Sequence, residues 1–440
     1  MPRSSVYCPQ RTDDVPDGFE GLIAAEDSVA SRIKGHLGVA DDWGKRWDSL
    51  SHGERKRAQI AVALWRQPAV LALDEPTNHI DGEARAILLP ALRDYPGIGL
   101  LVSHDRELLD GLCRRCLFLD PPGAVMRPGD YSSGREEAIR EEACARNRKE
   151  MARQRAARLQ EEARRRMSRA RDVDRGLSKK GLDPRDHDRR ARIDLARLTG
   201  VDGRTAKLAG RMRSRSEQAL QAAENIKVRK RYELGIWIDG ERCRRDTLFR
   251  LSAGAIPLGS ARTLVHPDLI MSPGDRIGLT GANGTGKSTL VRRLLGAMDL
   301  PPGMLTYLPQ EIDLPSARAI LEDVRRRPPG ILGKIMTVVS RLGSRPEALR
   351  ASPEPSPGEL RKLLLALGIA LQPHLIIMDE PTNHLDLPSI ECLEEALADC
   401  PCGLLLVSHD ELLLRRLTQK RWHIIRKRND GRDQTMLQIL

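Results

Sequence analysis

The chain contains an internal repeat, and this repeat constrains its fold more than any other feature of the sequence. Four short motifs occur twice in the same order, the first pair at an offset of 300 residues and the other three at an offset of 305. The first copies are Tyr7-Cys8-Pro9-Gln10, Leu50-Ser51-His52-Gly53-Glu54, Leu73–Asp81 and Val102-Ser103-His104-Asp105; the second copies are Tyr307-Leu308-Pro309-Gln310, Pro355-Ser356-Pro357-Gly358-Glu359, Met378–Asp386 and Val407-Ser408-His409-Asp410. The near-constant offset predicts two homologous domains.

Short apolar runs precede several of these motifs. Val70–Leu73, Leu100–Val102, Leu375–Met378 and Leu404–Val407 have the length and composition of buried parallel strands. Polar residues that follow such strands meet at one edge of an open α/β sheet, which is where ligands bind. We therefore predict an α/β fold whose site is formed by the loops that follow the strands.

One motif occurs only in the second half of the chain. Gly281-Ala-Asn-Gly-Thr-Gly-Lys287-Ser288 fits the phosphate-binding pattern G-x-x-x-x-G-K-[ST], between a strand-like segment, Arg276–Leu279, and an apolar helical segment, Leu290–Leu295. The glycines let backbone N–H groups close around phosphate oxygens, Lys287 reaches the outer phosphates, and the Ser288 hydroxyl can bind magnesium. A glycine-rich turn without a ligand fits this context poorly.

The length of 440 residues is enough for two or three domains. No run approaches the roughly 20 apolar residues that a membrane-spanning helix needs, and no apolar core of a signal peptide follows Met1-Pro2-Arg3-Ser4. The eight cysteines lack the paired spacing of a disulfide framework or zinc site, and we interpret Cys113-Arg-Arg-Cys116 as two incidental thiols. We expect a soluble protein in a reducing cytoplasm, with no membrane partner.

The excess positive charge lies between the two repeats. Residues 135–232 contain 30 Lys and Arg against 16 Asp and Glu, a net charge of +14, whereas the whole chain has +12. Apolar residues at helical spacing predict two antiparallel helices with a turn near Gly176–Pro184 and an interruption at Gly200–Gly203. The two apolar rows are Leu159, Ala163, Met167, Ala170 and Val173, and Leu208, Met212, Leu220, Ala223 and Ile226.

Such a segment is either a solvated spacer or a polyanion-binding element. A spacer does not require its charge to be concentrated in this way, so we favour a polyanion, whose phosphates Lys and Arg neutralise. Tyr232 is the only aromatic residue of the segment, which argues against stacking on splayed single strands and favours folded RNA.

Together these residues resemble the ATP-binding cassette (ABC) superfamily. Within it the chain looks like the ABC-F branch, because both repeats carry Asp-Glu-Pro-Thr-Asn-His-(Ile/Leu)-Asp and a charged helical linker joins them. The resemblance covers about residues 1–130 and 245–425 by motif, and the middle by architecture only. It implies two P-loop NTPase nucleotide-binding domains, the first N-terminally truncated, joined by an α-helical hairpin. Members act on ribosomes, as translation factors or as antibiotic-resistance proteins that protect the ribosome.

The resemblance also implies roles for single residues, with ATP and Mg²⁺ as the ligands. Glu380 is the general base for the attacking water, His409 the switch histidine, Lys287 the P-loop lysine, Gln310 the Q-loop glutamine and Asp379 the carboxylate near magnesium. The implied ATP-binding residues are Gly281, Asn283, Gly284, Gly286, Lys287, Ser288, Thr289 and Gln310, and the implied magnesium residues are Ser288, Gln310 and Asp379.

Cassettes of this superfamily pair head to tail, so the resemblance implies that Ser51 and Gly53 of the first repeat complete the site built on Lys287. The opposite site would use Ser356 and Gly358 with Gln10, Asp74, Glu75 and His104, but it has no P-loop in this chain. Pro357 also stands where the family has Gly. We predict a first domain at 1–133, a linker at 134–235 and a second domain at 236–440, paired within one monomer. The linker is expected to contact the ribosome, its rRNA or tRNA.

Comparison of the two repeats suggests that Met1 is an internal or misassigned start, or that the gene is a truncated copy. A strand and a P-loop equivalent to those of the second repeat would precede Gln10, and their loss would leave Val70–Leu73 and Leu100–Val102 exposed on one side. Other functions remain open. They are the ATPase component of a membrane transporter, a DNA-repair ATPase, and an inactive truncated copy.

Overall fold

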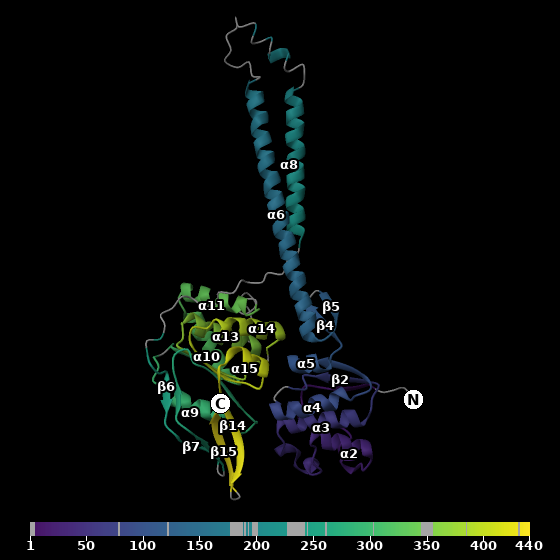
Figure 1. Ribbon diagram of the computed structural model, residues 1–440, viewed down its shortest axis with the longest axis vertical. Helices are drawn as coiled ribbons and strands as arrows, with labels where there is room; N and C mark the ends of the chain where they lie inside the picture. Colours follow the sequence, from purple (N-terminus) through teal and green to yellow (C-terminus); the bar gives the residue numbers. More distant parts are fainter. Residues whose placement is uncertain are drawn as a thin grey trace. The chain divides into compact units, whose positions relative to one another are not determined.

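The computed structural model describes residues 5–77, 80–120, 123–176, 188, 191, 193–195, 201–226, 243, 245–259, 262–301, 303–344, 355–383, 385–429 and 432–440. The chain divides into two compact units. One is formed by Met1–Met126 together with Tyr232–Leu440, and the other by Arg127–Arg231. Below, "first repeat" denotes elements β1 to β5, "helix pair" denotes α6 and α8, and "second repeat" denotes elements β6 to β15 (Figure 1).

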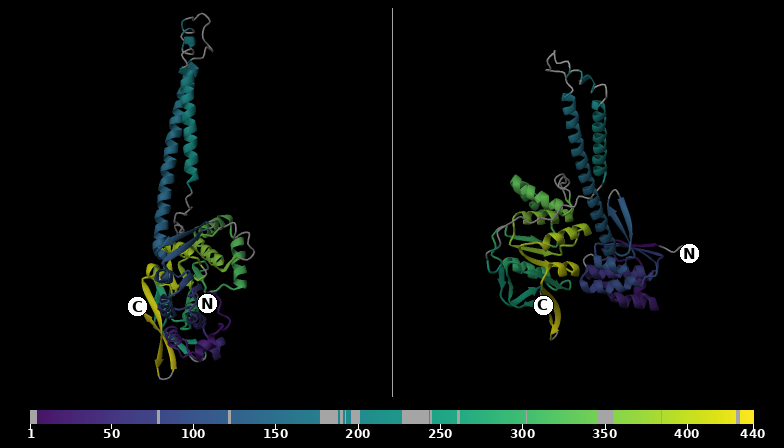
Figure 2. Two further views of the ribbon diagram at one scale, coloured as in Figure 1. Left: turned by 90° about the vertical axis from the view of Figure 1, so that its right-hand side faces the viewer. Right: turned by 45° about the horizontal axis from the view of Figure 1, so that its top comes forward.

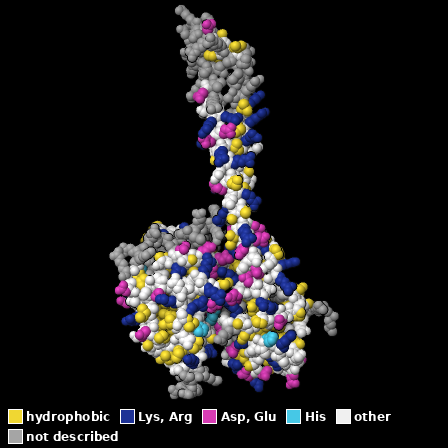
Figure 3. All heavy atoms as spheres, in the orientation of Figure 1, with side chains coloured by type: hydrophobic (Ala, Val, Ile, Leu, Met, Phe, Trp, Pro, Cys, Tyr) yellow, Lys and Arg dark blue, Asp and Glu magenta, His cyan; other side chains and the backbone are white. Residues whose placement is uncertain are grey.

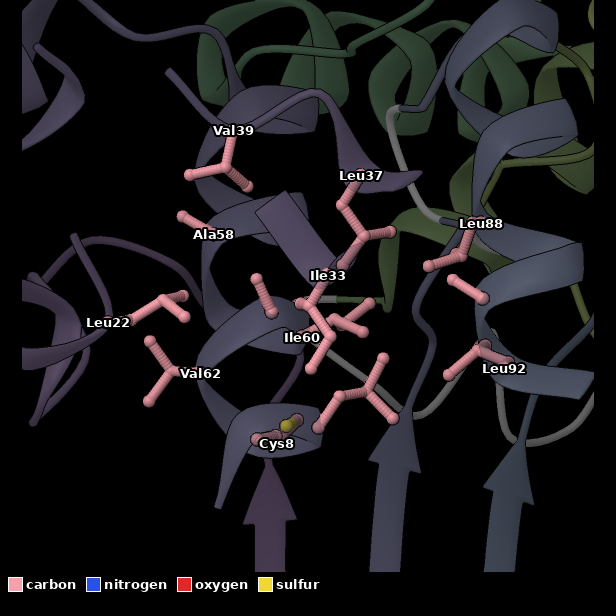
Figure 4. Packing of buried hydrophobic residues seen from close by; sticks show 14 of the residues in the cluster. Cys8, Leu22, Ile33, Leu37, Val39, Ala58, Ile60, Val62, Leu88 and Leu92 are labelled. Carbon is pink, nitrogen blue, oxygen red and sulfur yellow. The ribbon is translucent and has the colours of Figure 1, made fainter. Parts of the chain in front are cut away.

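The first repeat is a three-stranded parallel sheet packed against helices. Its strand order is β1 (Ser5–Cys8), β2 (Val70–Asp74), β3 (Ile98–Val102). The other elements are α1 (Phe19–Ala24), α2 (Ser28–Leu37), the 3-10 helix η1 (Trp43–Ser49), α3 (His52–Trp65), α4 (Gly82–Arg93), α5 (Arg106–Leu112), β4 (Arg115–Asp120) and β5 (Gly123–Pro128). Figure 4 shows one core between the helices and the sheet, formed by Cys8 with residues that include Leu22, Leu37, Ile60, Val62 and Leu88.

The second repeat contains an eight-stranded sheet in the order β11-β12-β13-β10-β14-β15-β8-β7, and a separate pair, β6 with β9. The strands are β6 (Phe249–Leu251), β7 (Gly254–Leu258), β8 (Arg262–His266), β9 (Leu269–Met271), β10 (Arg276–Gly281), β11 (Leu305–Leu308), β12 (Leu375–Asp379), β13 (Gly403–Val407), β14 (Lys420–Asn429) and β15 (Arg432–Ile439). The helices are α9 (Lys287–Ala297), α10 (Leu314–Arg326), α11 (Pro329–Arg341), α13 (Pro357–Ala370), α14 (Leu387–Ala398) and α15 (Glu411–Leu417). Strands β11, β12, β13 and β10 are parallel, which confirms the predicted α/β fold.

The repeated motifs also explain why helices begin at the same places in both repeats. Ser51 and Ser356 cap α3 and α13: each serine hydroxyl accepts from the N–H of the glutamate three residues later, and the carboxylate of that glutamate accepts from the serine N–H. Asp81 and Asp386 cap α4 and α14 in the same way, through a side-chain oxygen that accepts from a backbone N–H. Each such cap contributes about 1 kcal/mol of stability.

The equivalent strands β3 and β13 have different neighbours in the sheets of the first and the second repeat. In the second repeat β13 lies between β12 and β10 and is buried along its whole length. In the first repeat β3 is an edge strand of the described sheet, and Ile98, Leu100 and Val102 are 64%, 58% and 59% exposed. The predicted exposure of Leu100–Val102 is therefore seen at Leu100 and Val102, whereas Leu71 and Leu73 of β2 are buried.

The helix pair is formed by α6 (Tyr131–Gly176) and α8 (Val201–Asn225), which lie side by side in every view (Figure 2). The Nζ atom of Lys149 donates to the carbonyl of Ile226 at 3.0 Å, as expected for antiparallel helices. Ala163, Met212 and Ala223 are buried as predicted, but Leu208 and Leu220 are 50% and 42% exposed. Those two leucines therefore do not belong to the packed row.

Two predictions about this segment fall at the ends of its helices. Of the predicted interruption at Gly200–Gly203, Val201 to Gly203 form the first turn of α8, where a single glycine costs only about 1 kcal/mol, and Gly200 lies outside the described residues. Of the predicted turn at Gly176–Pro184, Gly176 is the last residue of α6, and residues 177–184 lie outside the described residues.

Cys400 and Cys402 form a disulfide, which we did not predict from the spacing of the cysteines. The chain turns at Pro401 and brings their Cα atoms to 5.5 Å, within the usual range for a disulfide. Among the helices that the structure describes, none is long and apolar enough to cross a membrane.

Candidate nucleotide-binding site

The P-loop connects the end of β10 to the start of α9. Gly286, the residue before α9, has φ +101°, and a Cβ there would lie 2.7 Å from Cδ2 of Leu258. Gly281 has φ +147°, and a Cβ there would lie 2.7 Å from the carbonyl oxygen of Ile424. Both positions therefore require glycine, and the loop turns so that the N-terminus of α9 faces the pocket described next.

A pocket of about 520 Å³ lies beside this loop. Its lining joins the P-loop to the ends of β7, β11 and β12. The lining residues are Pro257, Leu258, Gly259, Arg262, Asn283, Gly284, Gly286, Lys287, Ser288, Thr289, Gln310, Asp379 and Glu380. Nine of the predicted site residues are thus brought to one cavity from three segments that are far apart in the sequence.

Lys287 forms the centre of the polar network. Its Nζ atom donates to the carbonyl of Gly281 at 2.6 Å and lies 2.9 Å from Nε2 of His409. Burial, and then the nearby Lys287, lower the pKa of His409 to about 3, so the ring is neutral. The pKa of Lys287 is itself lowered by burial.

The two carboxylates at the end of β12 have different surroundings. Asp379 accepts a 2.8 Å hydrogen bond from the Ser288 hydroxyl, and its pKa is raised by burial. Glu380 has one oxygen, Oε1, 3.4 Å from Nε2 of His409, and burial raises its pKa to about 7. One carboxylate therefore faces the P-loop hydroxyl, and the other faces the histidine.

The backbone at Glu380 is strained. Its φ is +48°, which few residues other than glycine adopt, and its N–H donates to the carbonyl of Val407 at 2.8 Å. The first repeat reproduces this geometry, because Glu75 has φ +43° and its N–H donates to the carbonyl of Val102 at 2.8 Å. An unusual conformation shared by two equivalent glutamates indicates a specific requirement for the carboxylate direction.

The first repeat keeps the carboxylates and the histidine together. Glu75 lies 3.3 Å from Nε2 of His104, and burial raises the pKa of Glu75 to about 7. Asp74 accepts a 2.9 Å hydrogen bond from the Tyr7 hydroxyl, whereas Gln10 is exposed. Within the described residues, the first repeat provides no P-loop opposite these groups.

The structure does not bring every predicted residue to the pocket. Ser51 and Gly53 are not among the described residues that line it, and their equivalents Ser356 and Gly358 begin α13. Pro357 occupies the first turn of α13, a position that proline favours, so it fits the helix start without distortion. The first repeat contacts the P-loop through Asp81, whose Oδ2 accepts from the N–H of Asn283 at 3.0 Å.

Comparison with known proteins identifies the family. The profile of the family described as "ABC transporter" matches residues 2–78 and 264–329. The tylosin resistance ATP-binding protein TlrC of Streptomyces fradiae is 31% identical over 429 residues, which cover 92% of this chain and 72% of that protein. The chain belongs to the ABC-F subfamily of the ATP-binding cassette superfamily. The predicted resemblance is confirmed.

Two further matches place this ABC-F chain among its relatives. The ribosome protection protein VmlR of Bacillus subtilis (strain 168) is 27% identical, with 84% of this chain and 68% of that protein covered. A solved structure titled "RNase-L Inhibitor" has a TM-score of 0.59 at 19% identity, covering 98% of this chain and 74% of that one, which shows a shared fold. The chain spans only 60% and 54% of the length of two other curated relatives that it matches.

Sequence analysis missed several residues of the site. Pro257, Leu258 and Arg262 line the pocket, although no motif in this ABC-F sequence marks them. Arg361 of α13 was also missed, because a cation within an apolar helical stretch is ordinarily taken for a surface residue. The one signal that could have found it is the repeat itself, since Lys56 is its equivalent at the offset of 305.

Proposed function

We propose that this chain binds and hydrolyses ATP at the pocket built on Lys287. One observation carries the proposal: Lys287, Ser288, Asp379 and Glu380 line one cavity, and His409 contacts Lys287 beside it. The glycine-rich turn and the N-terminus of α9 provide backbone N–H groups for phosphate oxygens. Lys287 adds a positive charge that stabilises the outer phosphates.

Magnesium fits the same site. Ser288 Oγ and Asp379 Oδ2 are 2.8 Å apart at the edge of the pocket, and both are the hard oxygen donors that Mg²⁺ prefers. We propose that Ser288, Asp379 and Gln310 hold the ion. When bound, magnesium offsets the negative charge of the phosphates.

In this proposal Glu380 is the general base. It orients a water toward the terminal phosphate and accepts its proton, a role that suits a carboxyl group whose pKa is about 7. His409 is neutral, so it can hydrogen-bond to a phosphate oxygen or to the water without adding a second cation beside Lys287. The strained backbone of Glu380 supports this role, because it directs the carboxylate toward His409.

We propose the domain division 1–133, 134–235 and 236–440, with the two cassettes paired inside one monomer. Ser51 and Gly53 of the first repeat would close on the P-loop when ATP is bound and complete the site built on Lys287. The contact from Asp81 to the N–H of Asn283 supports an approach of the first repeat to this loop.

We further propose that the protein works in the cytoplasm on the ribosome, as a translation factor or as an antibiotic-resistance protein. Residues 135–232 carry a net charge of +14, and Figure 3 shows Lys and Arg side chains along the helix pair, with acidic side chains between them. Arg165 and Arg166 each pair with a glutamate one turn earlier, at Glu161 and Glu162, and remain partly exposed. The names of VmlR and TlrC, a ribosome protection protein and a tylosin resistance protein, support this partner.

Phosphate release from ATP with Mg²⁺ tests the enzymatic part of the proposal. We expect steady turnover by the unmodified chain and none detectable with Glu380→Gln. Turnover that persists in Glu380→Gln would indicate a contaminating ATPase or a different base. No turnover in the unmodified chain, at any magnesium concentration, would contradict the proposal.

A further inference from the structure

Arg361 is a buried cation within the second repeat. It lies on α13, one turn after the cap Ser356, and is only 2% exposed. A guanidinium group removed from water is costly unless its N–H groups find acceptors, so its partners carry the explanation. Among the described residues, the acceptors of its guanidinium group are backbone carbonyls.

The guanidinium group joins two segments that approach α13 from different strands. Nη1 donates to the carbonyls of Glu380 at 2.8 Å and Asn383 at 2.9 Å. Nη2 donates to the carbonyl of Pro309 at 3.0 Å and also to that of Gln310. One side chain thus connects α13 to the Gln310 loop after β11 and to the loop that begins at Glu380.

The first repeat contains a related arrangement with a different cation. Lys56 of α3 is also 2% exposed, and its Nζ atom donates to the carbonyls of Pro9 at 2.6 Å and Asp74 at 3.3 Å. These acceptors correspond to the two regions that Arg361 contacts in the second repeat. Pro9 precedes Gln10, and Asp74 is the last residue of β2. Arginine has a planar fork of N–H donors, so it can hold more carbonyls in a fixed geometry than the compact ammonium group.

We propose that Arg361 is a positioning residue for ATP hydrolysis. It fixes the backbone of Glu380 relative to Gln310 and to the start of α13, and a displacement of α13 or of the Gln310 loop therefore moves the general base. The inference rests on the proposed function at the same pocket. It concerns the linkage of three segments rather than contact with the nucleotide, because Arg361 hydrogen-bonds to backbone carbonyls behind the pocket.

The first test is kinetic and uses Arg361→Met, Arg361→Lys and a control, Lys362→Met. The control removes the neighbouring charge of the same helix and leaves the Arg361 hydrogen bonds in place. We expect Arg361→Met to lower kcat at least about tenfold while the KM for ATP changes less than about threefold, because a small displacement of a catalytic group is costly and the P-loop is unaltered. Arg361→Lys should retain an intermediate kcat, and the control should stay within about twofold of the unmodified chain.

The second test is hydrogen exchange, which needs no turnover. Arg361→Met should increase deuterium uptake in residues 309–312 and in residues 380–383 together, with little change in α9. If Arg361→Met does not fold, Arg361→Lys serves instead, since Lys56 shows that a lysine is tolerated at the equivalent position. A variant with a lower melting temperature but unchanged kcat, or unchanged uptake in either segment, would overturn the proposal. An unmodified chain without turnover would refute ATP hydrolysis, and hydrogen exchange would still decide whether Arg361 links the segments.

Discussion

The Nζ atom of Lys287 lies 2.9 Å from Nε2 of His409, so the P-loop lysine and the histidine after β13 meet directly. Glu380 approaches the same nitrogen at 3.4 Å. Because burial and Lys287 keep the pKa of His409 at about 3, the histidine is neutral and the positive charge of this cluster belongs to Lys287. Each of the three residues should therefore have a separable role in binding or in chemistry.

Glu380→Gln should abolish turnover while ATP remains bound. The amide keeps the shape of the side chain but cannot accept a proton, so we expect kcat to fall at least about a hundredfold. Binding of a fluorescent ATP analogue should change less than about threefold. Lys287→Ala is the matched comparison, since it removes a phosphate contact and should weaken analogue binding instead. Equal loss of binding in both variants would contradict these separate roles.

Glu75 should make the chain less stable as the pH rises. Its pKa in the folded chain is about 7, raised by burial from about 4.5, so the folded state favours the neutral form. The stability that this group contributes is present below about pH 4.5 and is lost as the pH rises through about 7. Glu75→Gln should therefore raise the melting temperature at pH 8 by a few degrees and leave it unchanged at pH 4. The exposed Glu26→Gln is the control, and a rise at both pH values would argue against ionisation as the cause.

The exposed edge of β3 should promote self-association. Within the described residues, β3 has a neighbouring strand on one side only, and its exposed apolar side chains lie at the type of edge at which strands of separate molecules pair. Leu100→Lys should reduce concentration-dependent association, measured by light scattering, because charged side chains discourage such pairing. Leu314→Lys changes a leucine of α10 that is 68% exposed and should have little effect. Equal effects of both substitutions would point to net charge rather than to the strand edge.

The strands, and the site at their C-terminal ends, could be predicted because short stretches of neighbouring residues indicate them. The apolar runs before Asp379 and Ser408 predict β12 and β13, and the P-loop pattern predicts the turn between β10 and α9. Caps such as Ser356 mark helix starts in the same way. These features depend on neighbouring residues, so one sequence is enough to find them.

Other features depend on contacts between distant segments, and the sequence did not reveal them. Arg361 can be buried only because two loops, with acceptors 52 and 19 residues away along the chain, bring carbonyls to it. Leu208 and Leu220 follow a helical spacing yet lie on the exposed side of α8, since the partner helix decides which face is covered. Pro257 and Leu258 of β7 line the pocket because of the order of the strands in the sheet. The periodicity of apolar residues in the sequence does not determine that order.

Co-sedimentation of the Glu380→Gln chain with bacterial ribosomes tests the central claim most directly. We expect binding in the presence of ATP that exceeds binding with ADP and weakens steeply with salt, because Lys and Arg of the helix pair neutralise phosphates. A triple variant, Arg164→Glu, Arg165→Glu and Arg166→Glu, should bind more weakly, while a control triple on exposed cations of the second repeat, Arg318→Glu, Arg325→Glu and Lys334→Glu, should not. Helicity and ATP binding should match in the two variants. Ribosome binding that depends on neither the nucleotide nor the helix-pair arginines would contradict the account.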